Sequence, residues 1–231
     1  SADGTVRIWQ AQEPPIVLEE AGAVLHVAWS PDGRGLVCTS DAGHARLWKV
    51  GEAGKPVTLG AHDAPVSMAA WNSSGSHIVT VSGTTASIWS KSSPRRPVIL
   101  AGCEEGVAHA AFSPDGETIA LALKNGRVLL YPAPGGGEPT VLVAGRSPLS
   151  MLDWSPDGQR ILAASEDGCA YLFSMQGVAA PIYLRGHVGV VRCAVFSPDG
   201  SRIVSCASDG KARTWDAARS QLLIPSILPA P

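Results

Sequence analysis

The chain has 231 residues, of which 45% are hydrophobic and only 16% are charged. This balance excludes a disordered chain and favours a fold with many buried strands. The formal net charge is −2 without a block of like charges, so we expect no binding to nucleic acid. No apolar run approaches the roughly 18 residues of a membrane helix, so we expect no membrane insertion.

Two strand-like segments in residues 5–18 come first, and five periods of about forty residues follow. Each period has four short strand patterns separated by turn residues. In the last period, the predicted strands cover 182–184, 190–196, 202–206 and 212–216, and the final outer strand covers 221–224. The first strands of the periods are predicted to begin near Val24, Val66, Val107, Leu149 and Val190.

An aromatic residue and a tight-turn sequence close each first strand. The spacings are 42, 41, 42 and 42 residues, from Trp29 through Trp71, Phe112 and Trp154 to Phe196. A second aromatic series with the same rhythm consists of Trp9, Trp48, Trp89, Tyr131, Phe173 and Trp215. A proline precedes each outer strand, as suits an edge where a missing N–H costs little: Pro15, Pro56, Pro97, Pro139 and Pro181. Four antiparallel strands per period predict an all-β propeller of four-stranded blades.

The last period resembles a WD40 repeat, and the resemblance extends over essentially the whole chain. Its marks are Gly186-His187, the turn that begins at Phe196, Ser205, Asp209-Gly210 and Trp215-Asp216. The resemblance implies a structural network of His187, Ser205, Asp209 and Trp215 within one blade. An earlier repeat keeps His62, Thr80 and Trp89, with Gly83 where the aspartate would stand.

The resemblance also implies that each repeat is offset from its blade. On that basis residues 1–231 form a single domain with five complete blades and a half blade in 1–20. The repeats cover approximately 21–60, 61–101, 102–143, 144–185 and 186–225, and 226–231 form a tail. Closed propellers protect strand edges by completing the ring, so we expect a fragment of a larger propeller of about seven blades. An open ring or a covering assembly is the alternative.

Catalytic and metal-binding patterns are not apparent in the sequence. The cysteines Cys38, Cys103, Cys169, Cys193 and Cys206 form no CxxC pair, and we expect reduced, packed thiols, with a Cys193–Cys206 bridge as the alternative. The histidines lack ligand spacing, and His26 and His109 are expected to line the central channel. We therefore expect no catalytic residue, metal or cofactor. The alternative is a propeller-fold hydrolase with a site at the channel mouth.

Loops on a rigid scaffold are the natural binding positions of such a fold. The expected partner-binding residues are Glu19, Glu20, Asp41, Asp63, Glu104, Glu105, Lys124, Arg146, Glu166 and Arg185. Their acidic excess favours a protein-interaction scaffold with a protein or peptide partner, of basic character. The family resemblance suggests a docking or sensory module of a larger bacterial signalling protein. We also expect a cytoplasmic location, and self-association through an open strand edge.

Overall fold

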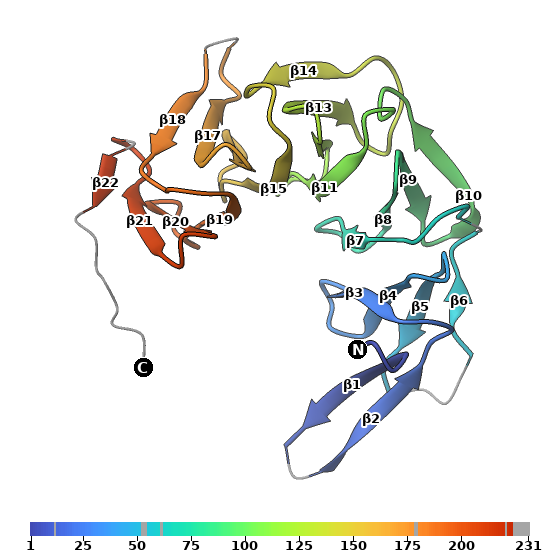
Figure 1. Ribbon diagram of the computed structural model, residues 1–231. Helices are drawn as coiled ribbons and strands as arrows, with labels where there is room; N and C mark the ends of the chain where they lie inside the picture. Colours follow the sequence, from blue (N-terminus) through green and yellow to red (C-terminus); the bar gives the residue numbers. More distant parts are fainter. Residues whose placement is uncertain (12, 52–54, 61, 178–179, 220, 224–231) are drawn as a thin grey trace. The chain divides into compact units, whose positions relative to one another are not determined.

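The described part of the chain consists of strands and turns, without a helix (Figure 1). The computed structural model describes residues 1–11, 13–51, 55–60, 62–177, 180–219 and 221–223. The prediction of an all-β fold is therefore confirmed. Within these residues, no helix is long and apolar enough to cross a membrane.

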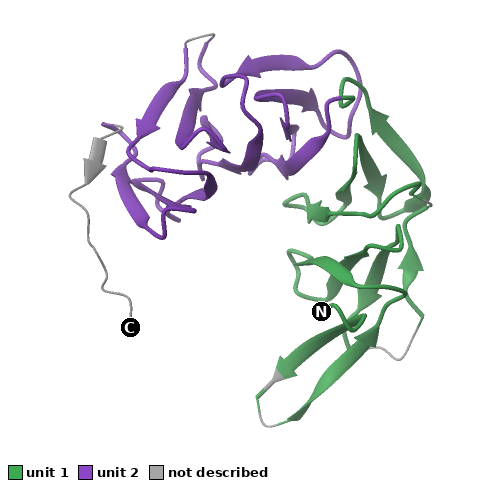
Figure 2. Cartoon of the chain, viewed as in Figure 1, with its two compact units in different colours: residues 1–104 green, residues 105–231 purple. Residues whose placement is uncertain are grey.

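The chain divides into two compact units, residues 1–104 and 105–231 (Figure 2). Unit 1 contains β1 (Thr5–Gln10), β2 (Glu13–Glu19), β3 (Val24–Trp29), β4 (Gly35–Ser40), β5 (Ala45–Lys49), β6 (Val57–Thr58), β7 (Met68–Trp71), β8 (His77–Ser82), β9 (Thr85–Ser90) and β10 (Ser93–Leu100). Unit 2 contains β11 (Val107–Phe112), β12 (Thr118–Leu123), β13 (Arg127–Pro132), β14 (Thr140–Val143), β15 (Leu149–Trp154), β16 (Arg160–Ser165), β17 (Cys169–Ser174), β18 (Ile182–Arg185), β19 (Val191–Phe196), β20 (Arg202–Ala207), β21 (Ala212–Asp216) and β22 (Gln221–Leu223).

Consecutive strands pair in antiparallel fashion and form separate sheets. In the described residues, β1 and β2 make a two-stranded sheet, and the strands from β3 onward make successive four-stranded sheets. The first strands of neighbouring sheets lie side by side within each unit, β3 beside β7 and β11 beside β15. The indole N–H of Trp71 donates to the Ala28 carbonyl (3.2 Å), so an aromatic residue of one first strand reaches back to the preceding one. These sheets have the form of propeller blades, while the predicted blade count and single domain stay predictions.

The turn between first and second strands is held by its own side chains. Ser197 Oγ donates to Asp199 Oδ1 (2.5 Å), which also accepts the N–H of Ser201 (3.0 Å). The hydrogen bond from Ser197, followed by that from the Ser201 backbone, lowers the pKa of Asp199 to about 2. Where the aspartate is missing, Asn72 Oδ1 accepts the N–H of His77 (2.9 Å) and closes the same turn.

Each unit has its own apolar core between its sheets. In unit 1, Leu59, Val66 and Ile78 pack around Trp89 between the sheets β3–β6 and β7–β10. In unit 2, one cluster joins the sheets β11–β14 and β15–β18, and another packs around Trp215 in the sheet β19–β22.

Some strand boundaries differ from the prediction. The strand expected near Val66 begins at Met68, because Val66 is buried in a loop and donates its N–H to Ser40 (3.1 Å). Pro15 and Pro97 lie inside β2 and β10, within register irregularities of edge strands, where a missing N–H is tolerated. Residues 224–231, which include the end of the predicted outer strand and the tail, lie outside the described residues.

Candidate functional site

The last sheet holds a chain of hydrogen-bonded side chains. The indole N–H of Trp215 donates to Ser205 Oγ (2.8 Å), which lies 2.8 Å from Nε2 of His187. On the other side of the ring, Nδ1 of His187 lies 3.1 Å from Oδ2 of Asp209. The residues that the resemblance pointed to are therefore brought together, and they link the loop before β19 to β20 and β21.

Arg213 belongs to the same cluster, although the sequence analysis missed it. Its Nη1 donates to Oδ2 of Asp209 (3.1 Å). Desolvation raises the pKa of Asp209, but the hydrogen bonds from the Val188 N–H and from His187 outweigh it and hold this pKa well below its usual value. A signal was present in the sequence, because residues two apart on a strand share a face and Arg213 precedes Trp215 by two.

A shorter network lies in the sheet β7–β10. The indole N–H of Trp89 donates to Thr80 Oγ1 (2.8 Å), and Nε2 of His62 lies 2.9 Å from the same oxygen. Burial lowers the pKa of His62, which favours the neutral imidazole. With Gly83 at the aspartate position, no carboxylate among the described residues completes this network.

Glu20 supplies the acceptor in the sheet β3–β6. Its Oε1 accepts the indole N–H of Trp48 (2.6 Å), and its Oε2 pairs with Nη1 of Arg46 (3.1 Å). Cys38 occupies the register position that Ser205 has in the last sheet, so no hydroxyl is available there. Burial, and then the charge of Glu20, raises the pKa of the Cys38 thiol to about 12.

The expectation that Glu20 faces a partner is therefore not met. Its side chain is only 1% exposed and is used within the sheet. The signals for this role in the sequence are the missing hydroxyl at Cys38 and the cation at Arg46. Arg46 occupies the same register position as Arg213, and each contacts a carboxylate.

Asp167 supplies a comparable acceptor in the sheet β15–β18. Its Oδ2 accepts the hydroxyl of Tyr171, which occupies the register position of Arg213. Burial, followed by the hydrogen bond to Asp167, raises the pKa of Tyr171 above its ordinary value. A carboxylate in the turn before the third strand thus accepts from Tyr171 in this sheet and from Arg213 in the last sheet.

The adjacent carboxylates Glu19 and Glu20 lie in different surroundings. Glu20 is engaged with Arg46, while its neighbour Glu19 is exposed, so the adjacent carboxylates do not act as a pair. Among the described residues, no group of three or more His, Cys, Asp or Glu side chains could hold a metal ion. The five cysteines are free, and Cys193 and Cys206 are register partners across β19 and β20.

A sequence model of the family described as "WD domain, G-beta repeat" matches residues 13–49, 55–90, 138–174 and 181–216. These segments cover more than half of the chain and carry the networks around Trp48, Trp89, Tyr171 and Trp215. The chain belongs to the WD40-repeat family. WD40 repeats imply a scaffold for protein interactions, and proteins of this family are in general not enzymes.

Human Coronin-7 is similar to this WD40 chain, with 26% identity over 156 residues. The similar segment covers 60% of the chain but only 17% of Coronin-7. The chain thus spans a small part of that relative.

The predicted partner-binding loops of unit 1 are joined to one another by backbone hydrogen bonds. The N–H of Asp41 donates to the Ala23 carbonyl (3.0 Å), which joins the β4–β5 turn to the β2–β3 loop. The N–H of Val66 donates to the Ser40 carbonyl (3.1 Å), which joins the β6–β7 loop to the same turn. Four acidic residues on or next to these loops and on the β10–β11 loop are exposed, whereas the side chain of Glu20 is buried. The exposed ones are Glu19, Asp41, Asp63 and Glu104.

The predicted loop residues of unit 2 are of mixed charge. Glu105, Lys124, Arg146, Glu166 and Arg185 are all exposed. The guanidinium of Arg185 lies over the ring of Tyr183, 4.9 Å from its centroid, which fixes one of the cations. The acidic excess of the predicted surface is therefore concentrated in the loops of unit 1.

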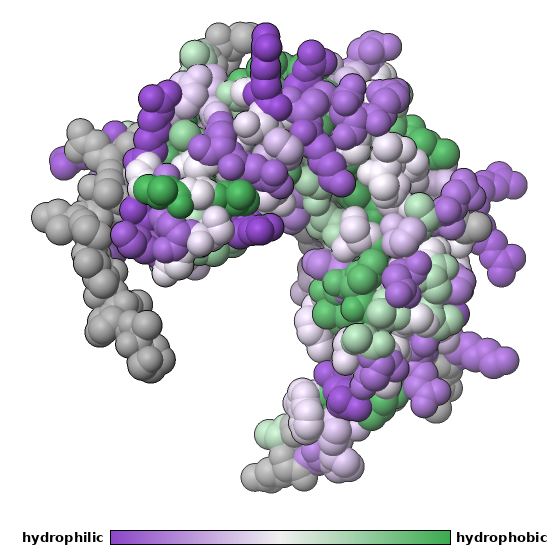
Figure 3. Space-filling view, viewed as in Figure 1, coloured by the Kyte–Doolittle hydropathy of each residue, from purple (hydrophilic) through white to green (hydrophobic). Residues whose placement is uncertain are grey.

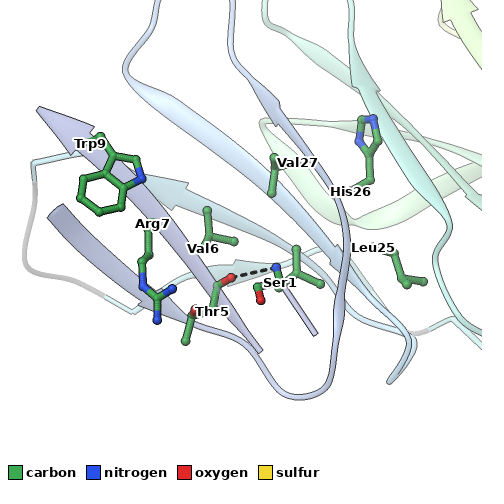
Figure 4. Close-up of a pocket in the computed structure, with 9 residues that line it drawn as sticks. Ser1, Thr5, Val6, Arg7, Trp9, Leu25, His26 and Val27 are labelled. Atoms are coloured by element: carbon green, nitrogen blue, oxygen red, sulfur yellow. Dashed lines mark hydrogen bonds between the residues drawn. The ribbon is translucent and has the colours of Figure 1, made fainter. Parts of the chain in front are cut away.

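A hollow of about 540 Å³ lies along β1 and β3 in unit 1 (Figure 4). Its lining includes Arg7 and Trp9 of β1 and Leu25, His26 and Val27 of β3. Within the described residues β1 pairs only with β2, and side chains of β3 are exposed although apolar. In Figure 3 hydrophobic side chains gather where Figure 1 places β3.

Proposed function

We propose that the chain is an interaction scaffold that holds a basic segment of a protein partner on the acidic loops of unit 1. The supporting observation is that Asp41 and Asp63 are exposed on loops whose backbones are hydrogen-bonded to one another. Fixed loops lose little conformational freedom on binding, so their charges act without an ordering cost. Opposite charge on the partner supplies attraction and steering.

The test is binding of a fluorescent peptide rich in lysine and arginine, measured by anisotropy. Reversal of Asp41 and Asp63 to lysine is expected to weaken binding about tenfold or more. Glu13→Lys is the matched control, because Glu13 is exposed and begins β2, whereas the acidic loops lie beyond the end of this strand. Equal loss in the control, or unchanged binding in the double variant, would contradict the proposal.

Among the described strands β1 pairs only with β2, and its other edge supports a further part of this proposal, self-association with a second copy. An unpaired strand beside exposed apolar residues is a template for strand addition. In this structure the carbonyl of Thr5 is already used by the amino group of Ser1 (3.0 Å), which leaves the segment from Arg7 to Trp9 as the pairing region (Figure 4). Light scattering of the full chain should show mass increasing with concentration, and Trp9→Lys should suppress it. A monomer at all concentrations would reject it.

A further inference from the structure

A second hollow in unit 1, of about 580 Å³, lies between the sheets β3–β6 and β7–β10. We call it the tryptophan hollow. Its apolar walls come from Trp48, Val57, Trp71 and Pro94. Val57 is 48% exposed, so the hollow opens to solvent beside β6.

The two indole rings of the hollow are fixed by hydrogen bonds inside the protein. Trp48 donates to Glu20 (2.6 Å), and Trp71 donates to the Ala28 carbonyl (3.2 Å). Neither ring therefore needs a polar partner from a ligand, and both offer apolar surface. Lys91 Nζ lies 5.8 Å from the centroid of the Trp71 ring, so a cation stands directly at the aromatic wall.

The rim of the hollow carries a surplus of positive charge. Arg34 and Lys91 are exposed, and within the described residues neither lies at salt-bridge distance from a carboxylate, although both charges contribute to lowering the pKa of Asp32. The single rim carboxylate, Asp32, already accepts hydrogen bonds from Ser30 Oγ (2.5 Å) and from the Arg34 N–H (3.0 Å). These bonds, the one from Ser30 first, lower the pKa of Asp32.

The positive charge continues along the outer side of the two sheets. A neighbouring hollow of about 450 Å³ shares Val57 with the tryptophan hollow and is lined by Arg95. Arg95 and Arg96 are both exposed on β10. Figure 3 shows hydrophilic side chains projecting along the side of unit 1 where Figure 1 places β6 and β10. This local surplus contrasts with the formal charge of −2 for the whole chain.

We propose that the tryptophan hollow docks an acidic peptide segment that carries one bulky apolar side chain. The apolar side chain packs between Trp48, Trp71 and Val57, while flanking carboxylates meet Arg34, Lys91 and Arg95. This surface is separate from the acidic loops. The hollow lies where β3 and β5 end, whereas the loops at Glu19 and Asp41 lie where these strands begin. Its charge preference is the opposite of that proposed for the loops, so the two proposals can fail separately.

The experiment measures binding of the full chain to a fluorescent peptide with one central phenylalanine between glutamate residues. Lys91→Glu and Arg34→Glu are each expected to weaken binding about tenfold. Val57→Gln should weaken it as well, because a polar side chain without charge replaces part of the apolar wall. The matched control is Arg127→Glu, an exposed cation on β13 of the other unit, which should leave binding unchanged. Circular dichroism verifies that the variants fold.

Three further probes decide between the proposal and simple charge attraction. A peptide with alanine in place of phenylalanine, and one with lysine in place of glutamate, should each bind at least about tenfold more weakly. A single-stranded oligonucleotide should not compete. Equal binding of the alanine peptide, stronger binding of the oligonucleotide, or unchanged affinity in Lys91→Glu would overturn the proposal.

Discussion

At the scale of single residues, a third-strand tryptophan needs an acceptor for its indole N–H, and different sheets supply different ones. Trp215 uses Ser205, Trp89 uses Thr80, and Trp48 uses Glu20. A buried donor without an acceptor costs about 1–3 kcal/mol, so replacement of the hydroxyl by Cys38 requires another partner. Glu20 is that partner, and its charge is in turn balanced by Arg46.

Glu20→Ala should lower the free energy of unfolding by about 2 kcal/mol, because it removes the acceptor of Trp48 and the partner of Arg46. Urea unfolding followed by tryptophan fluorescence measures the change. Glu19→Ala serves as the control, since Glu19 is exposed and adjacent, and its effect should stay within about 0.5 kcal/mol. Similar losses in both variants would show that Glu20 is no more than a surface charge.

The lowered pKa of His62 predicts that the free energy of unfolding decreases in mild acid. Burial lowers this pKa in the folded state below the ordinary value of 6.5, although the Gly43 carbonyl and the charge of Asp63 oppose this. The unfolded chain therefore takes up the proton first, so stability is present above about pH 6.5 and decreases as the pH falls below it. Burial lowers the pKa of His26 as well, which adds an effect of the same sign.

Urea midpoints between about pH 7.5 and pH 5 should decrease with falling pH, and His62→Gln should make the decrease smaller. Asp209 does not interfere in this window, because its lowered pKa affects stability only where carboxylates begin to protonate. A pH dependence that is the same in His62→Gln would assign the effect to other groups.

At the scale of elements, strand positions follow from period and turn chemistry, while the close contact between loops depends on glycine. Gly43 in the β4–β5 turn has a φ of +75°, and a Cβ added there would lie 2.9 Å from the carbonyl oxygen of His62. This approach brings the turn that carries Asp41 against the loop that carries Asp63. The spacing of the repeats does not predict this contact between the turn and the loop.

Gly43→Ala should destabilise the chain by about 2–3 kcal/mol, through a positive φ and a clash with backbone. Gly83→Ala separates the two causes, because Gly83 has a φ of +59° with nothing within 4 Å of an added Cβ. Gly83→Ala should lower the free energy of unfolding by only about 1 kcal/mol. Thermal unfolding of both variants gives the comparison, and equal losses would mean that the contact with His62 costs nothing.

At the scale of the whole molecule, the chain has two compact units with separate apolar clusters. Local stability follows such cooperative units, since amides exchange when their own unit opens. Each four-stranded sheet is a meander of neighbouring strands, so most of its pairing is local in sequence.

Hydrogen exchange of Glu20→Ala should therefore show faster exchange in β3–β5 of unit 1, with the amides of β12 and β16 in unit 2 unchanged. Mass spectrometry of peptic fragments resolves the two units. Uniform acceleration over the whole chain would instead indicate a single cooperative unit.

The sequence by itself determined the all-β class and the period of the sheets, because turn residues and alternation act locally. The network of the last repeat was implied only by the resemblance to the WD40 repeat. Only the tertiary structure decided that Glu20 is buried against Trp48, that Arg213 joins Asp209, and that Trp48 and Trp71 wall one hollow. Glu20 is 28 residues from Trp48, and Trp48 and Trp71 belong to different sheets. Whether a carboxylate faces solvent or a buried indole therefore depends on the packing of neighbouring strands. A repeat pattern carries no information about that choice.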